Sequence, residues 1–174
     1  MIIGLIGLGE MGSKIGKYIS KNGFEVISVY HGRSKISKGR ALEYGIKDAG
    51  SIDNFSKTAD LVISIIPPDK ALETADKYTI NGTKDDQIYC DLNAISTMTA
   101  KKLKKILDDR NVDYVDGSIM GGPPNEDYSP RTYLSGKLAK KISFLNGKGM
   151  NLVVLEGPDF QASATKMVYA AITK

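Results

Sequence analysis

The fold is decided at the start of the chain by the stretch Ile2-Ile3-Gly4-Leu5-Ile6-Gly7-Leu8-Gly9-Glu10-Met11-Gly12. Its first half is an apolar run typical of a buried strand, and residues 11–21 have the spacing of an amphipathic helix. Glycines stand between the two in the pattern G-x-G-x-x-G. A strand, this pattern and a helix in immediate succession predict a turn that holds the pyrophosphate of a dinucleotide.

Each glycine of this pattern has a separate physical task. Gly7 allows the tight turn, Gly9 lets a pyrophosphate approach the backbone, and Gly12 lets the helix pack close to the strand. The helix N-terminus adds free N–H groups and a partial positive charge. The alternative is a glycine-rich turn without a ligand. The expected cofactor-binding segment comprises Gly7, Leu8, Gly9, Glu10, Met11 and Gly12.

Along the rest of the chain, short apolar runs alternate with longer amphipathic stretches. Continuous apolar runs are typical of strands buried on both faces, and the alternation predicts an α/β fold with a doubly wound, mostly parallel, Rossmann-type sheet. We expect this dinucleotide-binding domain to cover residues 1–157. The expected strands are 2–6, 26–30, 61–66, 87–91, 112–116, 132–134 and 152–155, and the expected helices are 11–21, 35–44, 69–78, 97–110 and 136–146.

The last residues, 158–174, have the pattern of a helix that is still in progress where the chain stops. We interpret them as the first part of an inter-domain or C-terminal helix in a region that is truncated here. An apolar stripe on such a helix favours a partner surface, so we expect a homodimer. The stripe comprises Ala162, Ala164, Met167, Val168, Ala171 and Ile172.

Composition excludes several classes of protein. With one cysteine and one histidine among 174 residues, neither a disulfide framework nor a Cys- or paired-His metal site is available, and we expect no metal. The net charge is only +4, and the densest basic run lies on a helical pattern that spreads it around the helix, so we expect no nucleic acid as partner. No apolar run approaches the roughly 20 residues of a membrane span, and no basic leader is present, so we expect a cytoplasmic protein without membrane contact.

The end of the second expected strand bears on which dinucleotide is bound. An NAD site places an acid there for the ribose 2′-hydroxyl, whereas this chain has His31-Gly32-Arg33-Ser34-Lys35. Arg33 is suited to a bidentate contact with a 2′-phosphate, Ser34 can donate to the same group, and Lys35 adds charge. This favours NADP (NADPH) over NAD, with His31 and Gly32 as loop or adenine-side contacts. The alternative for Arg33 is a solvated loop residue.

The next two strands bring further residues to the same edge of the sheet. Ile66 ends the third long apolar run and Pro67 follows it, at the end that lines the cofactor cleft in doubly wound folds. Asn93 and Ser96 follow the fourth, where they are candidates to face the nicotinamide or a small anionic substrate. For both, the alternative is turn and N-cap chemistry.

At these residues the chain resembles the β-hydroxyacid dehydrogenase superfamily, which includes 3-hydroxyisobutyrate and 6-phosphogluconate dehydrogenases. The glycine pattern matches its G-L-G-x-M-G, and Asp91-Leu92-Asn93-Ala94-Ile95-Ser96 resembles its substrate and nicotinamide segment. Asp116-Gly117-Ser118-Ile119-Met120-Gly121-Gly122 resembles its substrate loop, and Ser163-Ala164-Thr165-Lys166-Met167 the segment with its catalytic lysine.

Some positions depart from the family pattern. Met120 stands where a substrate-binding serine is usual, so the resemblance implies that backbone N–H groups of Gly121 and Gly122 would contact a substrate carboxylate. Phe160 and Ala162 replace glycines before the lysine. Tyr169 stands where an asparagine is usual and shares a helix face with Lys166, so the resemblance implies that Tyr169, like Met120, lies against the substrate.

The resemblance implies hydride transfer between a nicotinamide and a small 3-hydroxy acid, with Lys166 as acid/base. The alternative for Lys166 is a surface lysine on the last helix. A second interpretation is an NADP-binding module without turnover, either regulatory or a fragment without its helical domain. A third, a reductase of imines on the same fold, is disfavoured because the residue at the position of Lys166 differs there.

Overall fold

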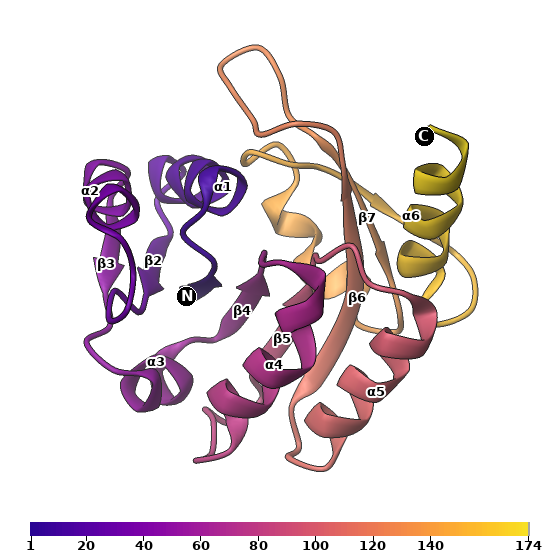
Figure 1. Ribbon diagram of the computed structural model, residues 1–174, viewed down its shortest axis with the longest axis horizontal. Helices are drawn as coiled ribbons and strands as arrows, with labels where there is room; N and C mark the ends of the chain where they lie inside the picture. Colours follow the sequence, from indigo (N-terminus) through magenta and orange to yellow (C-terminus); the bar gives the residue numbers. More distant parts are fainter. Residues whose placement is uncertain (174) are drawn as a thin grey trace.

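The computed structural model describes residues 1–173, and its centre is an eight-stranded sheet with the order β3-β2-β1-β4-β5-β6-β7-β8 (Figure 1). The neighbouring strands from β3 to β6 pair in parallel, β7 is antiparallel to β6, and β8 is parallel to β7. The direction of winding reverses between β1 and β4, which is where ligands bind in such sheets. The strands are β1 (Ile2–Ile6), β2 (Glu25–Ser28), β3 (Ile46–Asp48), β4 (Leu61–Ser64), β5 (Ile88–Asp91), β6 (Asp113–Met120), β7 (Arg131–Ser135) and β8 (Asn151–Val154).

Helices cover both faces of this sheet. Apolar side chains of α1, α2 and η2 form one core with the sheet, and those of α3, α4 and α5 form the other. The last helix, α6, packs on β6 and β7 beside α5 (Figure 1). The helices are α1 (Glu10–Lys21), α2 (Lys35–Glu43), α3 (Ile52–Thr58), α4 (Ala71–Thr79), α5 (Thr97–Asp108) and α6 (Gln161–Ile172), with 3-10 helices η1 (Pro68–Lys70) and η2 (Ala139–Leu145).

The central strands are buried on both sides, as their unbroken apolar sequences predict. Leu5 and Ile63 belong to one core, whereas Ile6 and Val62 belong to the other, because successive side chains point to opposite faces. Each such side chain contributes about 1.5–3 kcal/mol by leaving water. The α/β class and the doubly wound, mostly parallel sheet are confirmed.

Two elements were not predicted. β3 has three residues, of which only Ile46 is buried, and α3 has seven. Neither is long enough to show a period in the sequence. The second strand also ends at Ser28, two residues before the predicted end at Tyr30.

The helix predicted over 136–146 is present, but it is the shorter 3-10 helix η2 and not an α-helix. Its buried side chains are Ala139, Ile142 and Leu145, which recur every third residue. This is the period of a 3-10 helix, so one face of η2 meets the sheet along its whole length.

At the C-terminal end, α6 begins at Gln161, three residues later than predicted, and Lys174 lies outside the described residues. Only Ala162 and Ser163 of α6 are fully buried, whereas Val168 and Ile172 of the predicted apolar stripe are 59% and 77% exposed. None of the helices within residues 1–173 is long and apolar enough to cross a membrane.

Candidate functional site

The turn between β1 and α1 has the geometry that its glycines predict. Gly7 has a φ of +110°, and a Cβ there would collide with the Ile65 carbonyl oxygen. A Cβ on Gly12 would collide with the Gly7 carbonyl oxygen, so the helix and the strand touch at these two positions. In contrast, no atom lies within 4 Å of the place where a Gly9 Cβ would be. The open space therefore lies at Gly9, the N-cap of α1.

The first turn of α1 leaves its N–H groups free for a ligand. The Ser13 N–H donates to the Gly9 carbonyl, and the preceding N–H groups have no partner within the helix. The Glu10 carboxylate pairs with Lys14 at 3.1 Å. Leu8 is buried in the core. An anion at Gly9 would thus meet several N–H donors and the positive end of the helix dipole.

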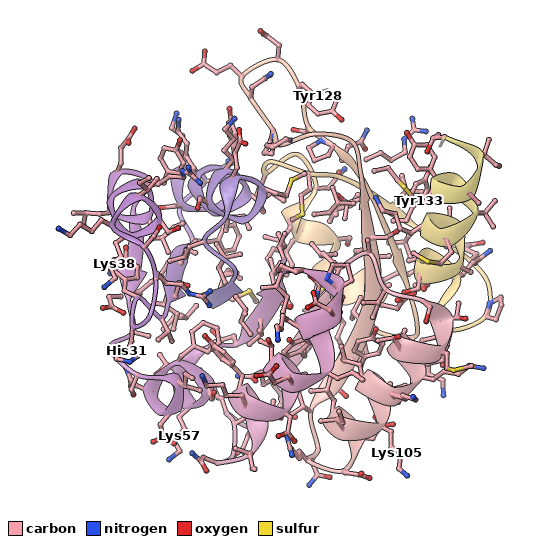
Figure 2. The ribbon with its side chains drawn as sticks, viewed as in Figure 1. His31, Lys38, Lys57, Lys105, Tyr128 and Tyr133 are labelled. Carbon is pink, nitrogen blue, oxygen red and sulfur yellow. The ribbon has the colours of Figure 1, made fainter. Side chains whose placement is uncertain are left out.

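A cleft of about 550 Å³ lies on the β2 side of this turn. It is lined by His31, Gly32 and Arg33 from the end of β2 and by Ile66 and Pro67 from the end of β4. Figure 2 shows His31 near α3, on the side of the molecule that carries this cleft. The residues that the sequence pointed to at two strand ends therefore share one cleft.

Arg33 extends across this cleft towards α4. Burial raises the pKa of the Tyr78 hydroxyl, and the Arg33 guanidinium beside it acts in the opposite direction. Lys70, Glu73 and Lys77 also line the cleft, and Glu73 pairs with Lys70, which leaves Lys77 and Arg33 as its unbalanced charges. The cleft is therefore basic on the α4 side. Gly50, Ser51 and Ile52 also line the cleft, and they come from the turn between β3 and α3 and from the start of α3, which the sequence pattern did not reveal.

Ser34 and Lys35 lie outside the residues that line this cleft. Ser34 is the N-cap of α2, and its Oγ accepts a hydrogen bond from the Ser37 N–H at 3.1 Å. Lys35 is exposed on the first turn of the same helix. The nearby Asp48 carboxylate accepts from the N–H groups of Tyr30 and Gly50, both at 3.0 Å. It closes the turn after β3 and is not part of the cleft wall.

A second hollow, of about 210 Å³, lies on the other side of Ile66, which lines both. Met11 contributes from the glycine-rich turn and Lys166 from α6. Ile65, Leu92 and Ile119 form an apolar wall that the sequence did not single out, although Ile65 and Leu92 follow buried strands and Ile119 lies one residue before the end of another. The remaining lining residues are Pro68, Asn93, Ala94 and Gly121.

Lys166 is half-buried and points into this second hollow. Its Nζ donates a hydrogen bond to the Ile119 carbonyl oxygen at 2.7 Å and lies 6.0 Å from the centre of the Tyr169 ring. Burial lowers the pKa of the Lys166 amine from its ordinary value of 10.5. The sequence alone left a surface lysine as an alternative, and the structure instead places the ammonium at the C-terminal edge of the sheet.

Asn93 lines the same hollow, but its side chain is used inside the protein. Its Oδ1 accepts from the Ile66 N–H at 2.6 Å, and its Nδ2 donates to Ser64 Oγ and to Asp91 Oδ2. Asn93 therefore joins the ends of β4 and β5, and both of its amide N–H bonds are already committed. These bonds give Asn93 a role in shaping the wall of the hollow, and its contact with a ligand stays a prediction.

Four further predicted substrate contacts, Ser96, Met120, Gly122 and Tyr169, lie outside the lining of this hollow. Ser96 is the N-cap of α5, and its Oγ accepts from the Thr99 N–H at 3.2 Å, as the capping alternative predicts. Met120 is buried at the end of β6, and Tyr169 is 47% exposed on α6. Gly121 lines the hollow, and Gly122 follows it as an exposed residue.

No group of three His, Cys, Asp or Glu side chains within residues 1–173 is placed to hold a metal ion. The residues do fit a dinucleotide. The open turn at Gly9, with its free N–H groups, lies beside the basic cleft and beside the apolar second hollow that Lys166 lines. The strand order and this turn define a Rossmann-type dinucleotide-binding domain.

The comparison with protein families identifies the class more closely. The model of the NAD binding domain of 6-phosphogluconate dehydrogenase matches residues 2–142, and the chain belongs to this family. The resemblance stated from its motifs is thereby confirmed.

Individual relatives are similar over most of this chain but are longer. An uncharacterized 28.5 kDa protein of Methanothermus fervidus is 33% identical over 174 residues, which are 100% of this chain and 66% of that protein. The mitochondrial 3-hydroxyisobutyrate dehydrogenase of Drosophila melanogaster is 26% identical over 77% of this chain and 41% of the enzyme. A solved conserved protein, described as similar in structure to 3-hydroxyacid dehydrogenases, has a TM-score of 0.85 and 29% identity over 99% of this chain and 64% of its own.

Proposed function

We propose that this chain is the cofactor-binding part of an NADP-dependent oxidoreductase of the 3-hydroxyacid dehydrogenase type. The family and the fold support an NAD(P)-binding oxidoreductase, and the arrangement of the two hollows supports the rest. One observation carries the proposal: the Lys166 amine and Met11 of the glycine-rich turn line the same hollow.

The cofactor would lie along the C-terminal edge of the sheet. The pyrophosphate fits at Gly9, where a Cβ would meet open space and the first turn of α1 offers N–H groups. The adenosine half fits the basic cleft, in which Arg33 is suited to a 2′-phosphate because a guanidinium binds phosphate with two parallel hydrogen bonds. Neither β2 nor β3 contributes an acid to the lining of this cleft, and the Glu73 carboxylate that does line it pairs with Lys70.

The second hollow is suited to proton transfer. A bound nicotinamide would supply the site that accepts or returns the hydride. Lys166 in its neutral form accepts the proton that a substrate hydroxyl loses on oxidation, and its ammonium returns that proton on reduction. This role needs an amine whose pKa lies below that of a solvated lysine, which burial beside Ile119 provides.

The substrate class follows from the few polar groups near Lys166. Ile65, Leu92 and Ile119 leave room for only a small apolar part, while Lys166 favours an anion. Because Met120 provides no hydroxyl group, the carboxylate would be held by the ammonium and by the N–H groups at Gly121 and Gly122. A small 3-hydroxy acid satisfies these requirements.

Calorimetric titration with NADPH and NADH, followed by a screen of small 3-hydroxy acids with NADP, tests this proposal. We expect tighter binding of NADPH and turnover of at least one acid. Equal affinity for the two cofactors would contradict the role of Arg33.

The alternative is an NADP-binding module without turnover. Met120 and the committed amide of Asn93 favour it, because they remove two side chains that would otherwise contact a substrate. NADPH binding without turnover of any tested acid, in a protein with an intact Lys166, would favour this alternative.

A further inference from the structure

We propose that Asp116 and Ser163 form a buried contact that positions Lys166 over the second hollow. Asp116 lies on β6 and Ser163 on the first turn of α6, and their exposed fractions are 2% and 0%. The functional role of this contact rests on the role proposed for Lys166. The geometry of the contact is independent of that role.

The Asp116 carboxylate accepts hydrogen bonds from several donors at once. The Ser163 N–H donates to Oδ2 at 3.0 Å, Ser135 Oγ donates to the same oxygen at 2.8 Å, and the Ser163 hydroxyl donates to Oδ1. A buried carboxylate is stable only when such donors replace its water, and removing one leaves an acceptor partly unsatisfied. Asp116 therefore strongly restrains the start of α6.

Two further bonds attach the same helical turn to the sheet. The Ala162 N–H donates to Ser135 Oγ at 3.0 Å, and Ser118 Oγ donates to the Ala162 carbonyl at 2.9 Å. Ala162 and Ser163 are the fully buried residues of α6. The helix is thus fixed to β6 and β7 at its first turn, and its later turns are more exposed.

The contact also replaces a missing helix cap. The N-cap residue of α6 is Phe160, which has a left-handed φ of +67° and makes no side-chain cap hydrogen bond. Asp116 supplies the acceptor from a neighbouring strand instead. A carboxylate at this end of a helix is stabilised by the free N–H groups and by the helix dipole.

The restraint that Asp116 places on the first turn of α6 also limits the position of Lys166. Ser163 and Lys166 are three residues apart and share one face of α6, while their partners Asp116 and Ile119 are three residues apart on β6. The helix is thus held to one strand at two points, first by a carboxylate and then by a carbonyl. Loss of the first point would let α6 shift, and small displacements of a catalytic group are costly to turnover.

The decisive variant is Ser163→Ala, which removes one hydroxyl and creates no clash. We expect its Lys166 pKa, measured by NMR on ¹³C-labelled lysine, to rise towards 10.5 because the amine leaves Ile119 and meets water. Asp116→Asn keeps the size of the side chain but replaces one acceptor oxygen with a donor, so we expect a larger rise. A Lys166→Arg variant assigns the resonance.

Ser56→Ala is the matched control. Ser56 is also buried, and its hydroxyl donates to the Tyr78 carbonyl, away from α6. We expect it to lower the free energy of unfolding as Ser163→Ala does, without moving the Lys166 pKa. An unchanged Lys166 pKa in folded Ser163→Ala would overturn the proposal, whether or not Asp116→Asn folds.

Turnover separates this proposal from the proposed function. If an acid is turned over, Ser163→Ala should lower kcat by roughly two- to tenfold, the loss expected for one hydrogen bond, with the KM for NADPH unchanged. If no acid is turned over but the Lys166 pKa still responds to Ser163→Ala, the positioning contact stands and the dehydrogenase function fails. A kcat loss that equals that of Ser56→Ala would reduce Asp116 and Ser163 to a purely structural role.

Discussion

The Lys166 ammonium donates its hydrogen bond to the Ile119 carbonyl oxygen, 2.7 Å away, and so α6 is joined to the end of β6 beside the glycine-rich turn. This single bond turns the side chain inwards, and the resulting burial lowers the pKa of its amine. A lysine whose charge is partly desolvated, and whose amine lines a hollow at the switch point of the sheet, is a candidate for acid/base chemistry.

Replacement of Lys166 by alanine should lower turnover by about 10²–10⁴, the usual contribution of general acid/base catalysis. NADPH affinity should stay within a few-fold, because Lys166 is not among the residues that line the basic cleft. Steady-state kinetics and calorimetry on the same sample measure both. Near wild-type turnover in Lys166→Ala would remove the lysine from the mechanism and leave Tyr169 as the next candidate.

The pH dependence of turnover gives an independent check on Lys166. The neutral amine accepts a proton during oxidation, so the oxidation rate should rise with pH through the lowered pKa of Lys166, and the reduction rate should fall over the same range. The arginine in Lys166→Arg stays protonated, so any residual activity of this variant should lack this dependence on pH. An identical pH profile in wild type and Lys166→Arg would contradict the assignment.

Replacement of Arg33 by alanine should weaken NADPH binding by about 1.5–3 kcal/mol, the range for a hydrogen-bonded charged group, and leave NADH binding almost unchanged. Lys35→Ala is the control, since Lys35 is a neighbouring side chain of the same charge that lies outside the cleft wall. Titration of each variant with both cofactors measures the effect. A larger loss of NADPH affinity in Lys35→Ala than in Arg33→Ala would show that the assignment of the 2′-phosphate to Arg33 is wrong.

The sequence predicted the parts of this molecule that depend on local pattern. The first turn was predictable from Gly7 and Gly12, because a side chain at either position would collide with a backbone carbonyl oxygen. The sequence did not reveal β3, whose three residues carry only one buried apolar side chain, Ile46. The cleft wall that follows β3 was therefore missed as well.

The candidate site was predictable in its main residues but not in its supporting contacts. Lys166 and Arg33 were identified from a motif and from a missing acid, both of which are visible in the chain. The bond between Asp116 and Ser163 joins residues 47 positions apart, and only the path of α6 over β6 brings them together. Likewise, Asn93 is interpreted as a free polar group until the pairing of β4 with β5 places its amide against Ile66 and Ser64.

Stability should depend on the buried carboxyl of Asp91. Burial raises its pKa from 3.8 to about 7, so the folded protein retains a proton that the unfolded chain releases in this range. The contribution of Asp91 to the free energy of unfolding should therefore fall as pH rises from about 4 to about 7 and then level off. Urea unfolding at several pH values should show that this fall is absent in Asp91→Asn.

Asp60 provides a control of opposite sign. Its hydrogen bond with Lys84 lowers the pKa of the Asp60 carboxyl below 3.8, so its contribution is present above that value and is lost as pH falls through the folded pKa. Asp60→Asn should therefore lower the free energy of unfolding at neutral pH. The fall in this free energy between about pH 4 and about pH 7, which is assigned to Asp91, should remain. If Asp60→Asn and Asp91→Asn changed the pH dependence in the same direction, the assignment of the slope to Asp91 would be wrong.

Two glycine-to-alanine substitutions in the first turn should separate binding from folding. A Cβ at Gly9 meets no protein atom within 4 Å, so Gly9→Ala should fold with nearly unchanged stability but occupy the space that a pyrophosphate needs. A Cβ at Gly12 collides with the Gly7 carbonyl oxygen, so Gly12→Ala should shift α1 away from β1 and lower the thermal midpoint. We therefore expect the affinity of Gly9→Ala for NADPH to fall at least tenfold, which corresponds to about 1.4 kcal/mol of binding free energy. The stability of this variant should stay constant. Thermal unfolding with and without NADPH measures both quantities in one experiment, because a ligand raises the midpoint only if it binds the folded state. Gly9→Ala with the full wild-type shift on adding NADPH would mean that the cofactor does not lie at this turn.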